Sequence, residues 1–279
     1  MQTLHPTPLL DGIKFGEGPR WHDGKLWFSD MRGDTVYTVD EAGQRAVVVQ
    51  LPEPLHPSGL GWLPDGRLLI SCIGSATLLR LDADGLTTLH EAELKALVQG
   101  LNDMVVDTQG RAYIDFSRPG PEPRGPYGGI ILVTPEGEVR IVAEGMRSAN
   151  GLAITPDGKT LIAAETFGAR LHAFDIAPDG GLSGQRVWAE LKGYRPDGIC
   201  LDAEGAVWLG SVGYNTAFLR VKEGGEIADT IAVPEGRIAI AVALGGADRR
   251  TLFLLNSIND PSTGFIDTVR VEVPGAGLP

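Results

Sequence analysis

Short apolar segments recur along the chain at a nearly constant interval. Six triplets have the β-branched, aromatic and aliphatic character of buried strands, and successive triplets begin 42, 44, 49, 46 and 45 residues apart. They are Leu26-Trp27-Phe28, Leu68-Leu69-Ile70, Ala112-Tyr113-Ile114, Leu161-Ile162-Ala163, Val207-Trp208-Leu209 and Leu252-Phe253-Leu254. A strand-rich repeat of this length is typical of the blades of a β-propeller.

Turn dipeptides divide each repeat into strands. The first five triplets follow Asp23-Gly24, Asp65-Gly66, Gln109-Gly110, Asp157-Gly158 and Glu204-Gly205, which predict two-residue hairpins with positive φ. A second turn follows in most units, after an alternating segment such as residues 35–39. Each unit therefore predicts four antiparallel strands. Six units predict an all-β fold, a six-bladed β-propeller of four-stranded antiparallel blades that forms one domain over residues 1–279.

Two segments fall outside the regular repeat. The apolar N-terminal segment Thr3–Leu10 is expected to close the ring as the outer strand of the last blade, beside Gly264–Val273. Residues Glu91–Gln99 have the only helical pattern, which predicts a short excursion between blades.

Composition limits the classes of partner. Apolar residues make up 43% and charged residues 22% of the 279, and 24 Lys and Arg against 36 Asp and Glu give a net charge of −12. This balance disfavours nucleic acid and an anionic membrane surface. We find no transmembrane stretch, signal peptide or CxxC pair, so we expect a cytoplasmic protein in which Cys72 and Cys200 are reduced thiols.

Polar residues stand in register at the predicted start of five innermost strands. They are Glu17, Ser58, Asn102, Asn150 and Asp197; the last four lie eight residues before the turn glycine, and Glu17 lies seven before it. The sixth unit carries apolar Ile240-Ala241-Val242 instead. Because the innermost strands of a propeller surround one channel, we expect the five side chains to converge at its mouth.

An all-oxygen donor set of this kind suits a hard divalent cation. It comprises two carboxylates, two amides and a hydroxyl, and like charges at close range need a counter-ion or raised pKa values. The competing interpretation is local, because Asn, Asp and Ser before Gly commonly form turns. Glu17 fits that interpretation least, since Glu is a poor turn former.

At these positions the sequence resembles the regucalcin, gluconolactonase and luciferin-regenerating-enzyme-like (SMP-30-type) family. The matching motifs are Glu17-Gly-Pro-Arg-Trp21, Asn102-Asp103, Asn150-Gly-Leu-Ala-Ile-Thr-Pro-Asp-Gly158 and Pro196-Asp197-Gly198. The resemblance implies a six-bladed propeller with one divalent cation held by Glu17, Asn150 and Asp197. It further implies that Asn102 contacts substrate or a bound water and that Asp197 is the general base. Ca²⁺ is the first candidate for the ion, and Zn²⁺, Mg²⁺ and Mn²⁺ remain alternatives.

Other candidate substrate contacts come from the pocket wall and one long loop. Ser58 is expected to orient the substrate together with Asn102. The loop Asp115–Gly128 carries four prolines and the further candidates Arg118 and Tyr127, and it is either a partial lid or a solvated loop. Gly100 stands where sugar-lactone hydrolases of the family often have Arg, which favours either a less polar substrate or a substrate that is held from elsewhere.

The predicted function is hydrolysis of a lactone or related cyclic ester, a small-molecule substrate, by a monomer or weak homo-oligomer. The cation acts as Lewis acid and Asp197 as base. No HExxH or GxSxG motif or dinucleotide fingerprint points to another chemistry. Three alternatives stay open: a phosphotriesterase-like hydrolase, a metal-free enzyme resembling strictosidine synthase, and a non-catalytic binding propeller.

Overall fold

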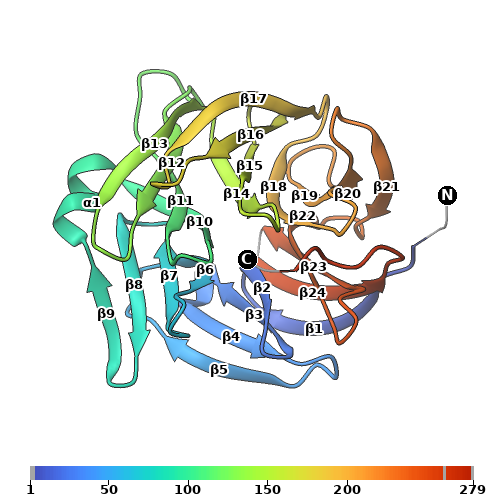
Figure 1. Cartoon of the computed structure of the whole chain (residues 1–279). Coiled ribbons are helices and arrows are strands. Elements are labelled where there is room, and N and C mark those ends of the chain that lie inside the picture. The colour runs from blue at the N-terminus through green and yellow to red at the C-terminus, as the bar shows by residue number, and fades with distance from the viewer. Residues whose placement is uncertain (1–3, 260–261, 278–279) are drawn as a thin grey trace.

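Six four-stranded antiparallel sheets surround a central channel in the computed structural model, which describes residues 4–259 and 262–277. Figure 1 shows the blades following one another around the ring in chain order, from blue to red. This arrangement confirms the predicted six-bladed β-propeller. Each apolar triplet lies in the second strand of its blade, next to the innermost strand.

In every blade the strands follow one another from the channel outward. Blade 1 contains β2 (Gly16–His22), β3 (Lys25–Asp30), β4 (Thr35–Val39) and β5 (Arg45–Gln50). Blade 2 contains β6 (Pro57–Trp62), β7 (Leu68–Cys72), β8 (Thr77–Asp82) and β9 (Gly85–Leu89). Blade 3 contains β10 (Gly100–Val106), β11 (Ala112–Ser117), β12 (Gly128–Val133) and β13 (Val139–Met146).

The remaining blades follow the same plan. Blade 4 contains β14 (Ala149–Ile154), β15 (Thr160–Glu165), β16 (Arg170–Ile176) and β17 (Leu182–Glu190). Blade 5 contains β18 (Pro196–Leu201), β19 (Val207–Ser211), β20 (Ala217–Val221) and β21 (Ile227–Ala232). Blade 6 contains β22 (Ile238–Gly245), β23 (Thr251–Asn259), β24 (Ser262–Arg270) and, outermost, β1 (Thr7–Ile13).

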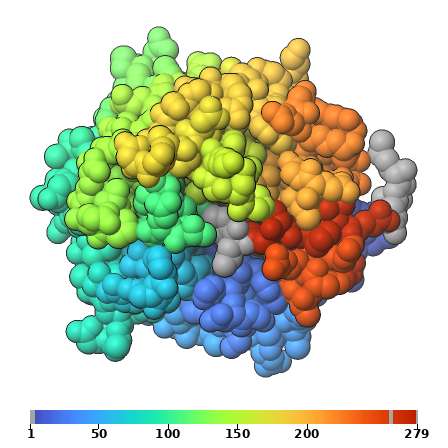
Figure 2. Space-filling view, viewed as in Figure 1, coloured from blue at the N-terminus to red at the C-terminus, as the bar shows by residue number. Residues whose placement is uncertain are grey.

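Strand β1 joins the N-terminal part of the chain to its last blade. It pairs antiparallel with β24, with Thr7 opposite Thr268 and Ile13 opposite Gly264. The blue β1 therefore lies beside the red β24 in Figure 1, and blue and red surfaces adjoin in Figure 2. The strand begins and ends later than the expected segment, whose first residue, Thr3, lies outside the described residues. Helix α1 (Glu91–Leu97) lies within the segment expected to be helical, and a single 3-10 turn spans Met31–Gly33.

The turns differ in detail from the prediction. Only Asp23-Gly24 forms a two-residue hairpin in which both residues have positive φ, 48° and 74°. In the other four units the glycine alone has positive φ, and its N–H donates to the carbonyl three residues earlier, as from Gly66 to Leu63. The expectation of two-residue hairpins was therefore wrong for these four, because the longer turn needs only one left-handed residue.

The apolar core is divided into six layers, one between each pair of neighbouring blades. The layer that closes the ring packs Leu26 and Phe28 of blade 1 against Phe253 and Ile266 of blade 6. No helix within the described part of the chain is long and apolar enough to cross a membrane.

Glycines allow the innermost strands to approach one another at the channel. A Cβ added to Gly59 would lie 2.4 Å from the backbone nitrogen of Met104, and one added to Gly151 would lie 2.4 Å from the carbonyl oxygen of Asp197. Gly18 and Gly198 are equally constrained, at 2.1 and 2.4 Å from the next strand. Each of these glycines directly follows one of the polar residues that begin the innermost strands. Close strand packing therefore explains the X-Gly pattern on the innermost strands better than turn formation does.

Substitution of Gly151 by Ala is expected to lower the free energy of unfolding by about 3 kcal/mol, because the new methyl group overlaps backbone that cannot move without shifting β18. Gly158→Ala in the same blade is the matched control. An added Cβ at Gly158 has no neighbour within 4 Å, and only the φ of +69° is unfavourable for alanine. We therefore expect the free energy of unfolding to fall by about 1 kcal/mol. Urea unfolding of both variants measures the difference, and equal losses would contradict the close-packing argument.

Candidate active site

The structure places all five polar residues of the predicted pocket on innermost strands. Glu17 lies near the start of β2, Ser58 of β6, Asn102 of β10, Asn150 of β14 and Asp197 of β18. Because these strands run in the same direction around the channel, the five residues gather at one of its two mouths. In blade 6, β22 presents buried Ile240 and Ala241 on this side, so the pocket wall is apolar there.

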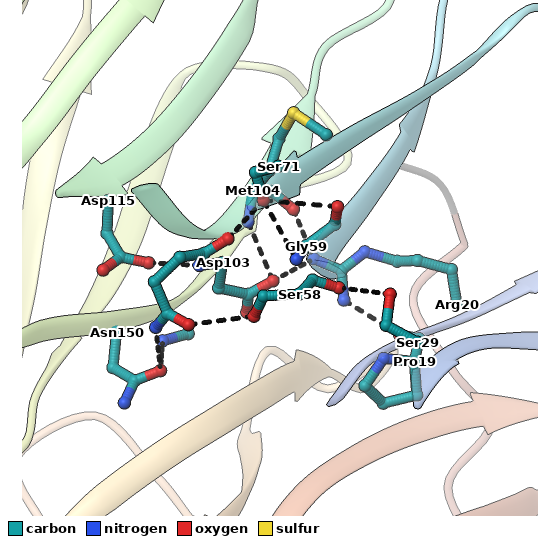
Figure 3. Close-up of polar contacts among 12 residues, drawn as sticks. Pro19, Arg20, Ser29, Ser58, Gly59, Ser71, Asp103, Met104, Asp115 and Asn150 are labelled. Atoms are coloured by element: carbon teal, nitrogen blue, oxygen red, sulfur yellow. Dashed lines mark hydrogen bonds and ion pairs between the residues drawn. The ribbon is translucent and has the colours of Figure 1, made fainter. Parts of the chain in front are cut away.

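A series of hydrogen bonds connects the pocket residues across blade boundaries. Ser58 Oγ donates to Asn102 Oδ1 at 2.9 Å, and Asn102 Nδ2 donates to Asn150 Oδ1 at 3.1 Å. Asn150 Nδ2 then donates to Thr166 Oγ1 at 3.3 Å, and Thr166 Oγ1 donates to the carbonyl of Pro196 at 2.8 Å. Figure 3 shows the part of this series that includes Ser58 and Asn150. The bonds tie blades 2 to 5 together and fix the amide orientations.

Glu17 and Asp197 form a pair of carboxylates at the mouth. Asp197 is buried, with 7% of its surface exposed, and Glu17 is half-buried. Burial, followed by the charge of Asp197, raises the pKa of Glu17 well above its usual value. Burial and the charge of Asp103 likewise raise the pKa of Asp197, and a hydrogen bond from Asn150 opposes this in part. The site therefore concentrates negative charge that the surrounding protein does not neutralise.

Two further carboxylates, Asp103 and Asp115, lie in the same cluster. Asp103 is 5% exposed and forms an ion pair with Arg20, with 3.2 Å between Oδ1 and Nη2. Arg20 also donates to the carbonyl of Met104 at 2.5 Å (Figure 3). Asp115 is 2% exposed and accepts the N–H of Asp103 at 2.5 Å; burial and the charge of Asp103 raise its pKa. Arg20 thus compensates one of four clustered carboxylates.

Sequence reasoning did not assign roles to Asp103, Asp115, Arg20 or Thr166, although one signal was present. The position directly after the apolar triplet is Ser29, Ser71 and Asp115 in the first three units. In the structure these side chains support the innermost strand of the next blade or of their own: Ser29 Oγ donates to the carbonyl of Ser58, Ser71 Oγ donates to that of Asn102, and Asp115 accepts the N–H of Asp103. Polar residues at the end of the second strand therefore mark this pocket.

Arg118 and Tyr127, the loop candidates, are not brought into the cluster. Arg118 Nε donates to the carbonyl of Leu97 at 2.8 Å, and its Nη1 forms an ion pair with Glu144 at 2.8 Å. Tyr127 packs over the loop itself, with its hydroxyl 3.4 Å from the backbone nitrogen of Glu122. It also lines a pocket of about 320 Å³ beside Phe167.

The residues at the mouth fit a divalent cation held partly by an amide. Among the described residues, no three His, Cys, Asp or Glu side chains form a metal-binding group by themselves. Glu17 and Asp197 provide two carboxylates, and Asn150 adds an amide next to Asp197, whose Oδ1 accepts hydrogen bonds from Asn102 Nδ2 and the N–H of Gly151 in this structure. No Lys, Arg or His of the described residues lies within ion-pair distance of Glu17 or Asp197, so their charges lack a partner from the protein. Oxygen donors with uncompensated charge are the ligands preferred by hard cations.

A larger cavity, of about 550 Å³, opens at the opposite mouth of the channel. Its lining includes Trp21, Trp62, Val106 and Ile199 but none of Glu17, Asn150 and Asp197. The segment after β24 borders this cavity, where the N–H of Ala276 donates to the carbonyl of Leu201 at 3.1 Å. We place the candidate active site at the mouth opposite this cavity, because the converging polar groups lie there.

The chain is similar to known proteins in both sequence and structure. Residues 15–257 match the model of the SMP-30/Gluconolactonase/LRE-like region. The 6-deoxy-6-sulfogluconolactonase of Pseudomonas putida is 28% identical over 95% of this chain and 94% of its own length. Lactonase drp35 of Staphylococcus saprophyticus is 24% identical over 95% and 84%. The crystal structure of a calcium-binding protein, regucalcin, from Agrobacterium tumefaciens superposes with a TM-score of 0.79 at 25% identity, covering 98% of this chain and 94% of that one.

Substitution of Arg20 by Gln is expected to lower the free energy of unfolding by about 3 kcal/mol, because it leaves Asp103 buried without its partner. Adding Asp103→Asn to the same chain should recover part of this loss. Lys222→Gln, which breaks the exposed pair with Glu226, is the control and should cost less than about 1 kcal/mol. Urea unfolding measures all three variants. If Arg20→Gln lowers the free energy of unfolding as little as the control does, the ion pair between Arg20 and Asp103 does not stabilise the fold.

Proposed function

This chain belongs to the SMP-30/gluconolactonase/LRE-like family, and from that membership we propose that it is a hydrolase that opens a lactone or a related cyclic ester. The observation that carries the proposal is the cluster of Glu17, Asn150 and Asp197 at one mouth of the channel. Two of the relatives, from Pseudomonas putida and Staphylococcus saprophyticus, are named as lactonases, which supports this class of reaction.

We propose that Glu17, Asn150 and Asp197 hold one divalent cation, with Ca²⁺ as the first candidate. Their oxygen donors and unpaired charges support this assignment, as does the relative named as a calcium-binding protein. When bound, such an ion polarises the ester carbonyl and offsets the negative charge that develops on its oxygen. Zn²⁺, Mg²⁺ and Mn²⁺ have the same charge and remain alternatives.

The chain's own side chains supply proton transfer and orientation. Asp197 is the proposed general base: its carboxylate lies at the pocket and accepts a hydrogen bond from Asn150, which holds it in place to take a proton from the attacking water. Asn102 presents its amide to the substrate. Ser58 has no exposed surface and donates to Asn102 Oδ1, so we assign it to holding that amide rather than to touching the substrate.

Substitution of Asp197 by Asn is expected to lower kcat/KM for lactone hydrolysis by at least about a hundredfold, because a general base contributes this much or more. The variant keeps the size and shape of the side chain, so the fold should not change. An unaltered circular dichroism spectrum would verify this. A panel of aliphatic and sugar lactones, with phosphotriesters beside them, is the assay. Turnover of phosphotriesters alone would favour the phosphotriesterase alternative, and wild-type lactone rates in the variant would refute the role of Asp197.

Removal of divalent cations with a chelator should lower both activity and the midpoint of thermal unfolding. A bound ion at a hundred times its dissociation constant stabilises the folded state by about 2.7 kcal/mol, which corresponds to several degrees. Re-addition of Ca²⁺ should restore both quantities. Glu17→Gln, which removes one proposed ligand, is the control that should show a smaller shift. Elemental analysis that finds no divalent metal, together with no effect of chelation, would count against a metal-dependent enzyme.

A further inference from the structure

Two arginines approach the same aromatic ring at the rim of the candidate active site. The guanidinium carbon of Arg124 lies 4.6 Å from the ring centroid of Phe167, and that of Arg195 lies 5.6 Å from the same centroid. Arg195 is also 5.9 Å from the ring of Tyr214, which is 97% exposed. These cation–π contacts gather two positive charges at one place.

The position of this group relates it to the catalytic cluster. Phe167 directly follows Thr166, whose hydroxyl accepts a hydrogen bond from Asn150. Arg195 stands two residues before Asp197, directly before the innermost strand of blade 5. Arg124 comes from the long loop of blade 3 and lines, with Phe167, the pocket of about 320 Å³. Segments of three blades therefore place the two arginines at the mouth that holds Asn150 and Asp197.

Neither guanidinium has an acidic partner. Within the described part of the chain, no carboxylate lies within ion-pair distance of Arg124 or Arg195, whereas nearby Arg118 is paired with Glu144. A phenyl ring attracts a cation but does not cancel its charge. The protein has a net charge of −12, so two unpaired cations held together form a region of positive charge on a negatively charged molecule. Their mutual repulsion is relieved when an anion binds between or beside them.

We infer that Arg124 and Arg195 form a subsite for a negatively charged substituent of the substrate, such as a sulfonate, a phosphate or a carboxylate. The inference rests on the proposed function and narrows it to lactones that carry an anionic group away from the ester. A contact with an aromatic ring uses up no N–H donor of a guanidinium group, so both arginines keep donors for two-point hydrogen bonds to anionic oxygens.

Arg124 and Arg195 supply positive charge from two sides of Phe167, from the long loop of blade 3 and from the segment before blade 5. A substrate held there would have its ester at the Asp197 end of the mouth and its anionic group at the Phe167 rim.

The test compares kcat/KM for glucono-δ-lactone, which is neutral, with that for 6-phosphogluconolactone, 6-deoxy-6-sulfogluconolactone and a lactone with a carboxylate. Wild type is measured beside Arg124→Gln, Arg195→Gln and the double variant. Each substitution should lower kcat/KM for at least one anionic lactone about tenfold more than for the neutral one, mainly through KM, because a hydrogen bond to a charged group is lost. The substituent is identified by the anionic lactone whose loss of kcat/KM in the variants most exceeds the loss for the neutral lactone. Added salt should reduce the advantage of wild type over the variants on the anionic lactones.

Arg45→Gln is the matched control, because Arg45 lies 4.7 Å from the ring of Tyr37 in an exposed cation–π contact on another blade. It should change none of the ratios. Equal losses on neutral and anionic lactones in the double variant, or no loss, would overturn the subsite. If wild type hydrolyses no lactone at all, the proposed function fails; binding of 6-phosphogluconate, measured by calorimetry, then decides the subsite separately. Weakening of that binding by the double variant would support it, and unchanged binding would overturn it.

Discussion

The close approach of the innermost strands at the channel is the constraint on which the rest of this structure depends. Backbone from one blade lies where the side chain of the next would be, and only glycine at positions such as Gly59, Gly151 and Gly198 makes this possible. The residue before each glycine is thereby drawn towards its counterparts. Residues far apart in the sequence, such as Ser58, Asn102 and Asn150, then meet within hydrogen-bonding distance.

Crowding at the axis also concentrates charge. Burial, together with the charge of Asp103, raises the pKa values of Glu17, Asp115 and Asp197, and Arg20 is the ion-pair partner of Asp103. Desolvated carboxylates without partners are unfavourable for folding. A cation bound among them would neutralise their charge and so remove this unfavourable contribution to the free energy of folding. The same features that strain the folded protein therefore prepare a site for an ion and a polar substrate.

The repeat was sufficient to predict the architecture, because each apolar triplet must be buried and each turn glycine ends a strand. The register of Glu17, Asn150 and Asp197 also located the mouth where they gather. Other details depend on neighbours that the sequence does not reveal. Arg118 turns away because Leu97 and Glu144 supply its hydrogen-bonding partners, and Asp115 has a role beyond starting a loop only because β10 brings the N–H of Asp103 to it. Turn length, too, followed from local hydrogen bonding rather than from the dipeptide.

The sixth blade combines strands from opposite ends of the sequence, with Thr7 opposite Thr268. While the ribosome is still making the protein, β1 has no neighbour to pair with, since β24 emerges last. The nascent polypeptide can build blades one after another, yet its circle stays open until β24 has been made. Because the mouth is assembled from strands held in place by that circle, the molecule gains its working geometry only once β24 has paired with β1.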